Sequence, residues 1–284
     1  MRRPSSVFVF VIMLLVWGCS PRPRPAPSAA PRRVVSLVPS ATETVFALGL
    51  GDRIVGVSRY DDYPDAVRAL PKVGGMTDPS YEAIMALNPD GLIGVQGPLN
   101  LAVIGRLQSR GVQTAFPRVE SIDEVLASFE QFAQFFGAPE RAAPLRREVT
   151  QGVARVTAAV QGLARPRVLA IYSLRPLIVA GRGSWVDGLV TLAGAENVAR
   201  DAARYPTISL EQALAWRPEV LLDFAFTMGD AHDVAHALGP GGSLSALARC
   251  RVYRFNDVMF VRQGPRIAQA AEAIARRLHP EAHF

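Results

Sequence analysis

Short apolar runs alternate with amphipathic segments along the first half of the chain. The β-branched runs predict strands at 33–38, 54–57, 91–95 and 112–116. Helical spacing of apolar residues predicts helices at 40–48, 79–87, 99–109 and 122–136. Ser40 is expected to cap the first helix, with Glu43 three residues on completing a capping box. Strands and helices that alternate in this way predict a parallel α/β lobe over residues 33–138.

The alternation of strands and helices is then interrupted by a long segment and resumes after it. Residues 139–163 contain no strand signal and carry an apolar stripe from Leu145 to Val160, which predicts one long helix. Beyond it, strands are expected at 168–172, 177–179, 220–224 and 252–255. Helices are expected at 184–192, 209–215 and 265–278. The pattern therefore predicts two α/β lobes, 33–138 and 166–284, joined by a linking helix within 139–165.

The two halves repeat one local pattern. Segments 80–90 and 209–219 each begin with a serine that suits a helix cap and carry a glutamate two residues later, Glu82 or Glu211. Each then ends in a proline and an acid before a strand. First-turn acids are favoured in any helix, but the matched exits favour a structural repeat with Glu82 and Glu211 in equivalent places.

The first residues predict export. Two arginines precede an apolar run at 7–17 that is too short for an ordinary membrane span, so 1–18 is expected to be a signal peptide. Cys19 follows in a sequence that resembles the lipidation site of bacterial lipoproteins, and 19–32 reads as a lipidated cysteine with a Pro-rich tether. The alternative is an ordinary secretory signal with an incidental cysteine. A lipid on Cys19 would hold the protein at the periplasmic side of a bacterial membrane.

The net charge is unevenly distributed along the chain. The net charge of +6 comes entirely from residues 1–33, which hold six arginines and no acid, so the rest of the chain balances 25 bases against 25 acids. The bulk charge therefore argues against a nucleic acid as partner. Cys250 is left without a cysteine partner in the exported chain and is expected to be a buried free thiol.

Enzyme motifs are scarce in the sequence. It has neither a phosphate-binding P-loop nor a Gly-x-Ser-x-Gly nucleophile elbow. His232 and His236 have the spacing of two zinc ligands on one helix face, and they support the alternative of a metal-dependent hydrolase. A third ligand is not obvious, and a surface helix with two solvated histidines is the preferred interpretation.

Binding-type residues, many of them aromatic or arginine, gather instead on loops, of which 58–64 and 96–98 directly follow predicted strands. In the first half these loops are 58–64, 73–80 and 96–98, and in the second half 172–175, 204–206 and 262–266. Because α/β folds bind ligands at the carboxyl ends of their strands, this distribution predicts a ligand cleft between the lobes.

Several motifs together resemble a known family. These motifs are similar to those of the substrate-binding proteins of cobalamin, haem and siderophore ABC importers. They lie at 33–37, 39–43 (Pro-Ser-Ala-Thr-Glu), 56–58, 73–75 and 82–90. The resemblance covers most of 33–280 and implies two Rossmann-like lobes bridged by a rigid helix, with the ligand in a cleft. It implies a monomeric, non-enzymatic protein that docks on a membrane permease through one acid per lobe, matched here by Glu82 and Glu211.

Within that family the cobalamin-binding members are the most similar, which implies cobalamin or another corrinoid as ligand and no further cofactor. The resemblance puts corrin-packing residues at Tyr60, Met76, Val95, Tyr172 and Tyr205. At two of these positions, Met76 and Val95, large aromatics are expected in the family.

Two other ligands were weighed. The ligating tyrosine of the haem-binding members would fall on Gly75, so haem bound by that ligand is disfavoured. A ferric siderophore remains the alternative, because Arg59, Arg204, Arg262 and Arg266 could neutralise an anionic chelate; of these, Arg262 and Arg266 are also expected to line the ligand site.

Overall fold

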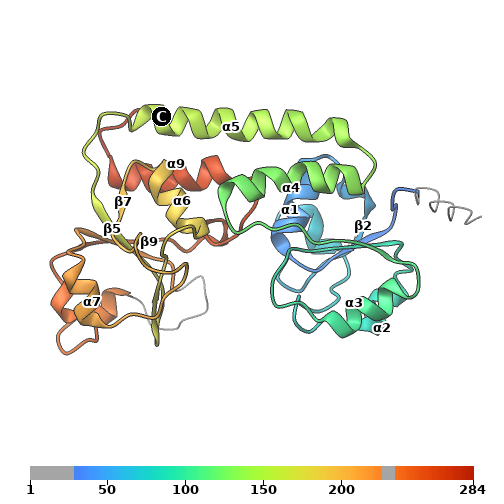
Figure 1. Cartoon of the computed structure of the whole chain (residues 1–284), viewed down its shortest axis with the longest axis horizontal. Helices are drawn as coiled ribbons and strands as arrows, with labels where there is room; N and C mark the ends of the chain where they lie inside the picture. Colours follow the sequence, from blue (N-terminus) through green and yellow to red (C-terminus); the bar gives the residue numbers. More distant parts are fainter. Residues whose placement is uncertain (1–28, 226–233) are drawn as a thin grey trace, which may run out of the picture.

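The structure is a computed structural model that describes residues 29–225 and 234–284. The predicted signal peptide, Cys19, most of the tether and His232 lie outside the described residues. Two lobes lie side by side, and one long helix runs across both of them (Figure 1).

The N-terminal lobe is built on a parallel four-stranded sheet in the order β2-β1-β3-β4. Its strands are β1 (Val34–Ser36), β2 (Ile54–Gly56), β3 (Gly91–Ile93) and β4 (Gln113–Ala115). Its helices are α1 (Pro39–Ala47), α2 (Tyr81–Ala86), α3 (Leu101–Gln108) and α4 (Ile122–Phe135), with short 3-10 turns η1 (Gly51–Arg53) and η2 (Asp65–Ala69). The predicted alternation of strand and helix is confirmed.

The C-terminal lobe repeats this plan with one addition. Its strands are β5 (Arg167–Leu174), β6 (Leu177–Val179), β7 (Glu196–Asn197), β8 (Val220–Asp223) and β9 (Arg251–Arg254). Its helices are α6 (Trp185–Leu192), α7 (Leu210–Ala215), α8 (Val234–Leu238) and α9 (Ile267–Leu278), with 3-10 turns η5 (Ser245–Leu247) and η6 (Val258–Phe260). The parallel order β7-β5-β8-β9 matches β2-β1-β3-β4, while β6 adds an antiparallel hairpin to the longer β5.

The linking helix α5 (Ala142–Ala159) follows a 3-10 turn, η3 (Pro139–Arg141), and packs on α4 of one lobe and α9 of the other (Figure 1). Gly152 lets α5 approach α9 closely, because a Cβ there would lie only 2.6 Å from that of Ala268. A single buried core runs through both lobes and α5, and smaller clusters lie under α2 and α3 and under α7 and α8. The lobes are therefore joined by packing as well as by the chain.

An arginine at an equivalent position in each lobe binds the C-terminal end of the repeated helix, α2 or α7. Arg33 donates from Nη2 to the carbonyl of Leu87 at 2.7 Å, and Arg167 donates from Nη2 to the carbonyl of Trp216 at 2.7 Å. The next residues, Asn88 and Arg217, have positive φ angles of 47° and 48°. The predicted repeat is confirmed down to single backbone angles.

One local prediction is wrong. Helix α1 begins at Pro39 after Val38, so Ser40 lies inside the helix and does not form a capping box with Glu43. Proline suits the first helical position because its φ is already helical and its missing N–H is not needed there. Glu43 is consequently free to act elsewhere.

Candidate ligand-binding site

The wall of the N-terminal lobe is formed by the loop after β2. Buried Asp61 accepts a hydrogen bond from the Ser58 hydroxyl, and Lys72 Nζ donates to the Asp61 carbonyl at 3.0 Å. These bonds fix the loop and leave the Tyr60 side chain 59% exposed. A Cβ on Gly75 would lie 3.1 Å from the Tyr60 ring, so the glycine makes room for the aromatic side chain.

Two other predicted contacts of this lobe differ in exposure. Met76 is half-buried and lies beside Gly97, where a Cβ would be 3.5 Å from Met76 Cε. Val95 is buried in the main core, so it offers a ligand little surface. The apolar surface of this wall therefore comes from Tyr60 and Met76.

The wall of the C-terminal lobe is an aromatic cluster at the ends of three parallel strands. Tyr172 lies in β5, Phe224 follows β8 and Phe255 follows β9. The Phe224 and Phe255 rings stack with centroids 5.3 Å apart, and Phe260 packs edge-on against Phe255 at 4.5 Å. Sequence reasoning missed these three phenylalanines, although an aromatic residue just beyond a buried strand is a usable signal.

Two tyrosines cover this cluster. The Tyr172 ring packs edge-to-face on that of Tyr205, with centroids 5.0 Å apart. Tyr205 is exposed, whereas Tyr172 is only 8% exposed and its hydroxyl has no hydrogen-bond partner among the described residues. Burial raises the pKa of Tyr172 well above its usual value, so the hydroxyl keeps its proton. Tyr205 therefore presents the surface, and Tyr172 supports it.

A buried ion-pair network joins the two lobes next to these walls. Arg266 binds both carboxylate oxygens of Glu43, with two contacts of 2.8 Å. Arg262 Nη1 donates to Glu43 at 3.2 Å and to Asp62 at 2.6 Å, and its Nη2 donates to the Tyr60 carbonyl at 2.9 Å. The Glu43 side chain is 1% exposed. The network holds the Tyr60 loop of one lobe on the C-terminal lobe.

Arg204 makes a second connection between the lobes. Its guanidinium pairs with Glu120, next to α4 of the N-terminal lobe. Because Tyr205 follows directly, this pair brings the Tyr205 loop to the boundary between the lobes. Tyr60 and Tyr205, which are far apart in sequence, thus project from loops that are both tied to the opposite lobe.

All four arginines considered for an anionic chelate are paired with carboxylates of the chain. Arg59 contacts Asp78 at 2.6 Å, and Arg204, Arg262 and Arg266 make the pairs described above. Arg262 and Arg266 lie at the boundary as predicted, but their role there is to bind Glu43. An anionic ligand would have to displace these acids.

Glu82 and Glu211 are exposed on the first turns of α2 and α7. Ser80 and Ser209 cap these helices by accepting hydrogen bonds from the third residue on, both at 3.2 Å. A hydrogen bond from the Ser209 side chain lowers the pKa of Glu211, which favours its charged form. The two acids hold equivalent places in the two lobes.

Two further residues that the sequence singled out, His236 and Cys250, lie outside these two walls. His236 is exposed on α8, and no cluster of three or more metal-ligating side chains occurs in residues 29–225 and 234–284. Cys250 is a free, half-buried thiol that donates to the Pro218 carbonyl at 3.2 Å. No helix within the described parts of the chain is long and apolar enough to cross a membrane.

Comparison with known proteins identifies the fold. The family model described as periplasmic binding protein matches residues 34–223. The chain belongs to the periplasmic binding protein family. Membership fits an extracytoplasmic location, and substrate-binding proteins of ABC importers bind a ligand and interact with a permease.

Relatives of this periplasmic binding protein align over nearly its whole length. The vitamin B12-binding protein of Yersinia pseudotuberculosis (strain IP 31758) is 27% identical over 276 residues, covering 97% of this chain and 93% of the relative. The vitamin B12-binding protein of Pectobacterium carotovorum (strain PC1) is 27% identical over 263 residues, covering 88% and 89%.

Two solved structures have the same two-lobed fold. The periplasmic heme-binding protein RhuT from Roseiflexus sp. RS-1, in apo form, superposes with a TM-score of 0.75 at 28% identity and covers 88% of this chain and 98% of its own. The periplasmic vitamin B12-binding protein BtuF of Vibrio cholerae superposes with a TM-score of 0.71 at 25% identity, covering 89% and 98%. The predicted two-lobed α/β class and family are confirmed.

Proposed function

We propose that this periplasmic binding protein captures cobalamin or a related corrinoid between its lobes and delivers it to the permease of an ABC importer, without catalysing a reaction. The observation that carries the proposal is the alignment with vitamin B12-binding proteins over 97% of the chain. Exposed Tyr60 and Tyr205 on loops at the lobe boundary add the apolar, aromatic surface that a large macrocycle needs.

The charges at the boundary favour a corrinoid over the ferric siderophore. A ferric chelate with catecholate or carboxylate groups needs unpaired cations, whereas Arg59, Arg204, Arg262 and Arg266 are engaged by acids. A corrin ring can rest on aromatic and thioether side chains without that compensation.

Calorimetric titration tests the ligand directly. We expect cyanocobalamin or cobinamide to bind saturably with one ligand per protein, and haem and ferric siderophores to bind at least about tenfold more weakly, a difference of about 1.4 kcal/mol. A bound corrinoid also gives a visible spectrum. Tighter binding of a ferric siderophore would contradict the corrinoid proposal. If neither a corrinoid nor a ferric siderophore binds, both ligand classes are excluded.

Replacing the boundary tyrosines is expected to weaken corrinoid binding. Tyr60→Ala and Tyr205→Ala should each cost about 1–3 kcal/mol of binding free energy, because each removes exposed aromatic surface from a loop at the boundary. Tyr63→Ala is the matched control, since Tyr63 is also exposed but stacks on Arg266 with 4.5 Å from guanidinium to ring centre. If calorimetry gives Tyr60→Ala and Tyr205→Ala the same affinity as Tyr63→Ala and the wild type, the two boundary tyrosines do not contact the ligand.

Cys19→Ser is expected to release the protein from membranes. We propose that Cys19 is lipidated, and each acyl CH₂ buried in the bilayer contributes about 0.8 kcal/mol to anchoring. Fractionation of cells expressing the variant measures the effect. Cys250→Ser, which alters the half-buried thiol, should stay with the membrane fraction. A Cys19→Ser protein that remains membrane-bound would contradict the anchor.

A further inference from the structure

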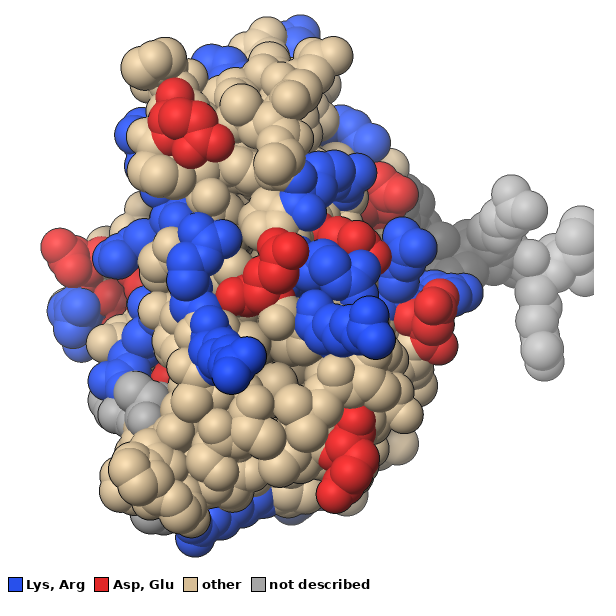
Figure 2. All heavy atoms as spheres, turned by 90° about the vertical axis from the view of Figure 1, so that its left-hand side faces the viewer, with Lys and Arg blue, Asp and Glu red and all other residues tan. Residues whose placement is uncertain are grey.

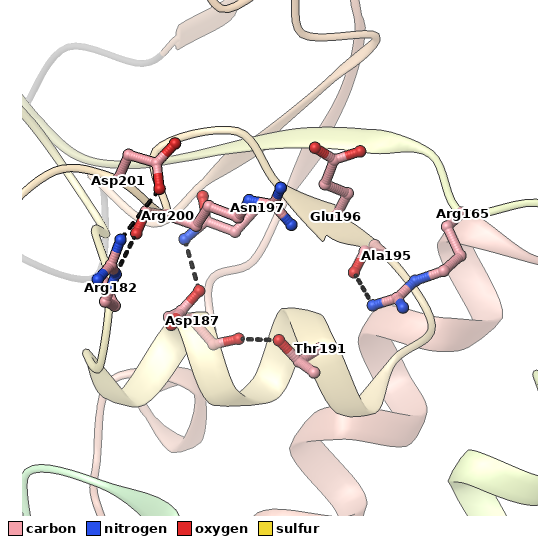
Figure 3. A pocket seen from close by; sticks show the side chains of 9 residues that line it. All are labelled: Arg165, Arg182, Asp187, Thr191, Ala195, Glu196, Asn197, Arg200 and Asp201. Carbon is pink, nitrogen blue, oxygen red and sulfur yellow. Dashed lines mark hydrogen bonds and ion pairs between the residues drawn. The ribbon is translucent and has the colours of Figure 1, made fainter.

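A polar cavity of about 460 Å³ is lined by residues between Arg165 and Asp201, in the C-terminal lobe and the segment just before it. It lies between α6, β7 and the segments that flank β7 (Figure 3). Figure 3 shows Arg182 and Arg165 at opposite ends of the cavity, with Asp187 and Thr191 on α6 between them. Its lining residues are Arg165, Arg182, Asp187, Thr191, Ala195, Glu196, Asn197, Arg200 and Asp201.

Each of the three acids in this cavity is already engaged. Asp187 accepts from Asn197 Nδ2 at 2.8 Å and from the Gly183 N–H at 2.9 Å. Glu196 pairs with Arg167 at 3.0 Å, outside the cavity lining. Asp201 pairs with Arg182 at 3.0 Å. Glu196 and Asp201 are therefore paired with arginines, whereas Asp187 is held by neutral donors and has no cation partner among the described residues.

Two of the three arginines lack such a partner. Arg165 donates from Nη2 to the Ala195 carbonyl at 3.0 Å, which fixes its guanidinium at the cavity edge without neutralising it. Arg200 bonds through its backbone: its carbonyl accepts from Arg182 Nε at 2.7 Å and its N–H donates to the Asn197 carbonyl at 3.3 Å. Within residues 29–225 and 234–284, neither Arg165 nor Arg200 has a carboxylate within ion-pair distance. Among the described lining residues, Arg165 and Arg200 are thus two cations without a carboxylate partner, and Asp187 is one carboxylate without a cation partner.

The end face of the C-terminal lobe also carries basic side chains (Figure 2). Figure 2 shows the end face of this lobe, where basic side chains gather around a few acidic ones. An anion approaching this face meets guanidinium groups on several sides. Guanidinium groups bind phosphate and carboxylate through paired N–H donors, which makes them selective for planar or tetrahedral oxyanions.

We propose that this cavity is a second binding site, independent of the cleft between the lobes, for a small organic anion that carries phosphate or carboxylate groups. Arg165 and Arg200 supply the charge and the N–H donors for the anion. The Thr191 hydroxyl on α6 donates to the Asp187 carbonyl at 2.9 Å, so towards a ligand it can accept from a hydroxyl group. The volume lies in the range of small-molecule sites, roughly 300–1,000 Å³, and exceeds what a bare ion needs. The phosphate could belong to a free metabolite or to a phospholipid headgroup.

Glycerol 3-phosphate serves as the soluble probe, with glycerol as the uncharged control. Calorimetry on the secreted domain without its signal peptide should give saturable binding of glycerol 3-phosphate and none of glycerol. Arg200→Gln should weaken that binding at least about tenfold, because a hydrogen-bonded charge is lost. Its side chain has no bond within the described structure, so folding should not change. Arg165→Gln added to it should weaken binding further.

The matched control is Arg110→Gln with Arg155→Gln, which removes the same charge from exposed arginines outside the cavity. Vesicles of phosphatidylglycerol and phosphatidylcholine form the second arm of the experiment. Binding to vesicles alone, lost in the cavity variants only, supports the site and assigns it to a headgroup. Absence of saturable binding to either probe, or equal loss in the control variant, would overturn the proposal.

Discussion

Reversing both Glu82 and Glu211 to arginine is expected to abolish transport while leaving ligand affinity in solution unchanged. The two acids are exposed on equivalent first turns, and the shared core and α5 fix their separation. A permease can therefore bind both acids at the same time, at a fixed distance from each other. Exposed ion pairs contribute only about 0.2–1 kcal/mol each, but they orient the encounter, and like charges at both points repel.

Uptake of labelled cobalamin by cells, measured beside calorimetry on the purified variant, separates docking from binding. Glu140→Arg with Glu148→Arg is the matched control, because these exposed acids on the linking-helix side change the net charge equally. Wild-type uptake by the Glu82 and Glu211 double variant would contradict the docking role. A loss of solution affinity would instead assign the acids to ligand binding.

Glu43→Ala is expected to lower the free energy of unfolding by about 3–5 kcal/mol, because removing one member of a buried ion pair leaves its partners uncompensated. Arg262 and Arg266 are 12% and 16% exposed, so water cannot replace the carboxylate. Arg262 would keep Asp62, but Arg266 would keep only a 3.7 Å contact with Asp257 as an ion pair, beside its stacking on the Tyr63 ring. The lobes would also lose their buried connection.

Denaturant unfolding measures this difference, and Glu130→Ala is the control. Glu130 pairs with Arg146 at 3.2 Å with both side chains about 40% exposed, and such surface pairs contribute about 0–1 kcal/mol. If Glu43→Ala is no less stable than Glu130→Ala, the network between the lobes does not stabilise the fold.

Much of the fold could be predicted because its signals are local. The spacing of apolar residues placed α4 and α5 within a few residues of their observed bounds. Ser80 and Ser209 were recognised as caps from their immediate neighbours. The short β7 and the 3-10 turns η1, η2, η5 and η6 were missed, because none of them carries a repeating pattern long enough to detect.

The site was predicted less completely. Tyr60 and Tyr205 were predicted from the resemblance and from their loops, and the structure shows both exposed, while their contact with a ligand stays a prediction. Tyr172 and Val95 were expected to contact a ligand, but both are buried, since they pack in the main core. Exposure depends on what packs above a residue, which no short segment encodes.

The sequence alone determined two α/β lobes, a linking helix and an internal repeat with Glu82 and Glu211 in matching places. These features follow from periodicity and capping within single segments. Only the tertiary structure decided that Glu43 binds Arg262 and Arg266, 219 and 223 residues away. In the sequence, a glutamate three residues after a serine looks the same whether it would cap its own helix or bind arginines of another lobe, because the packing of the lobes decides its partner.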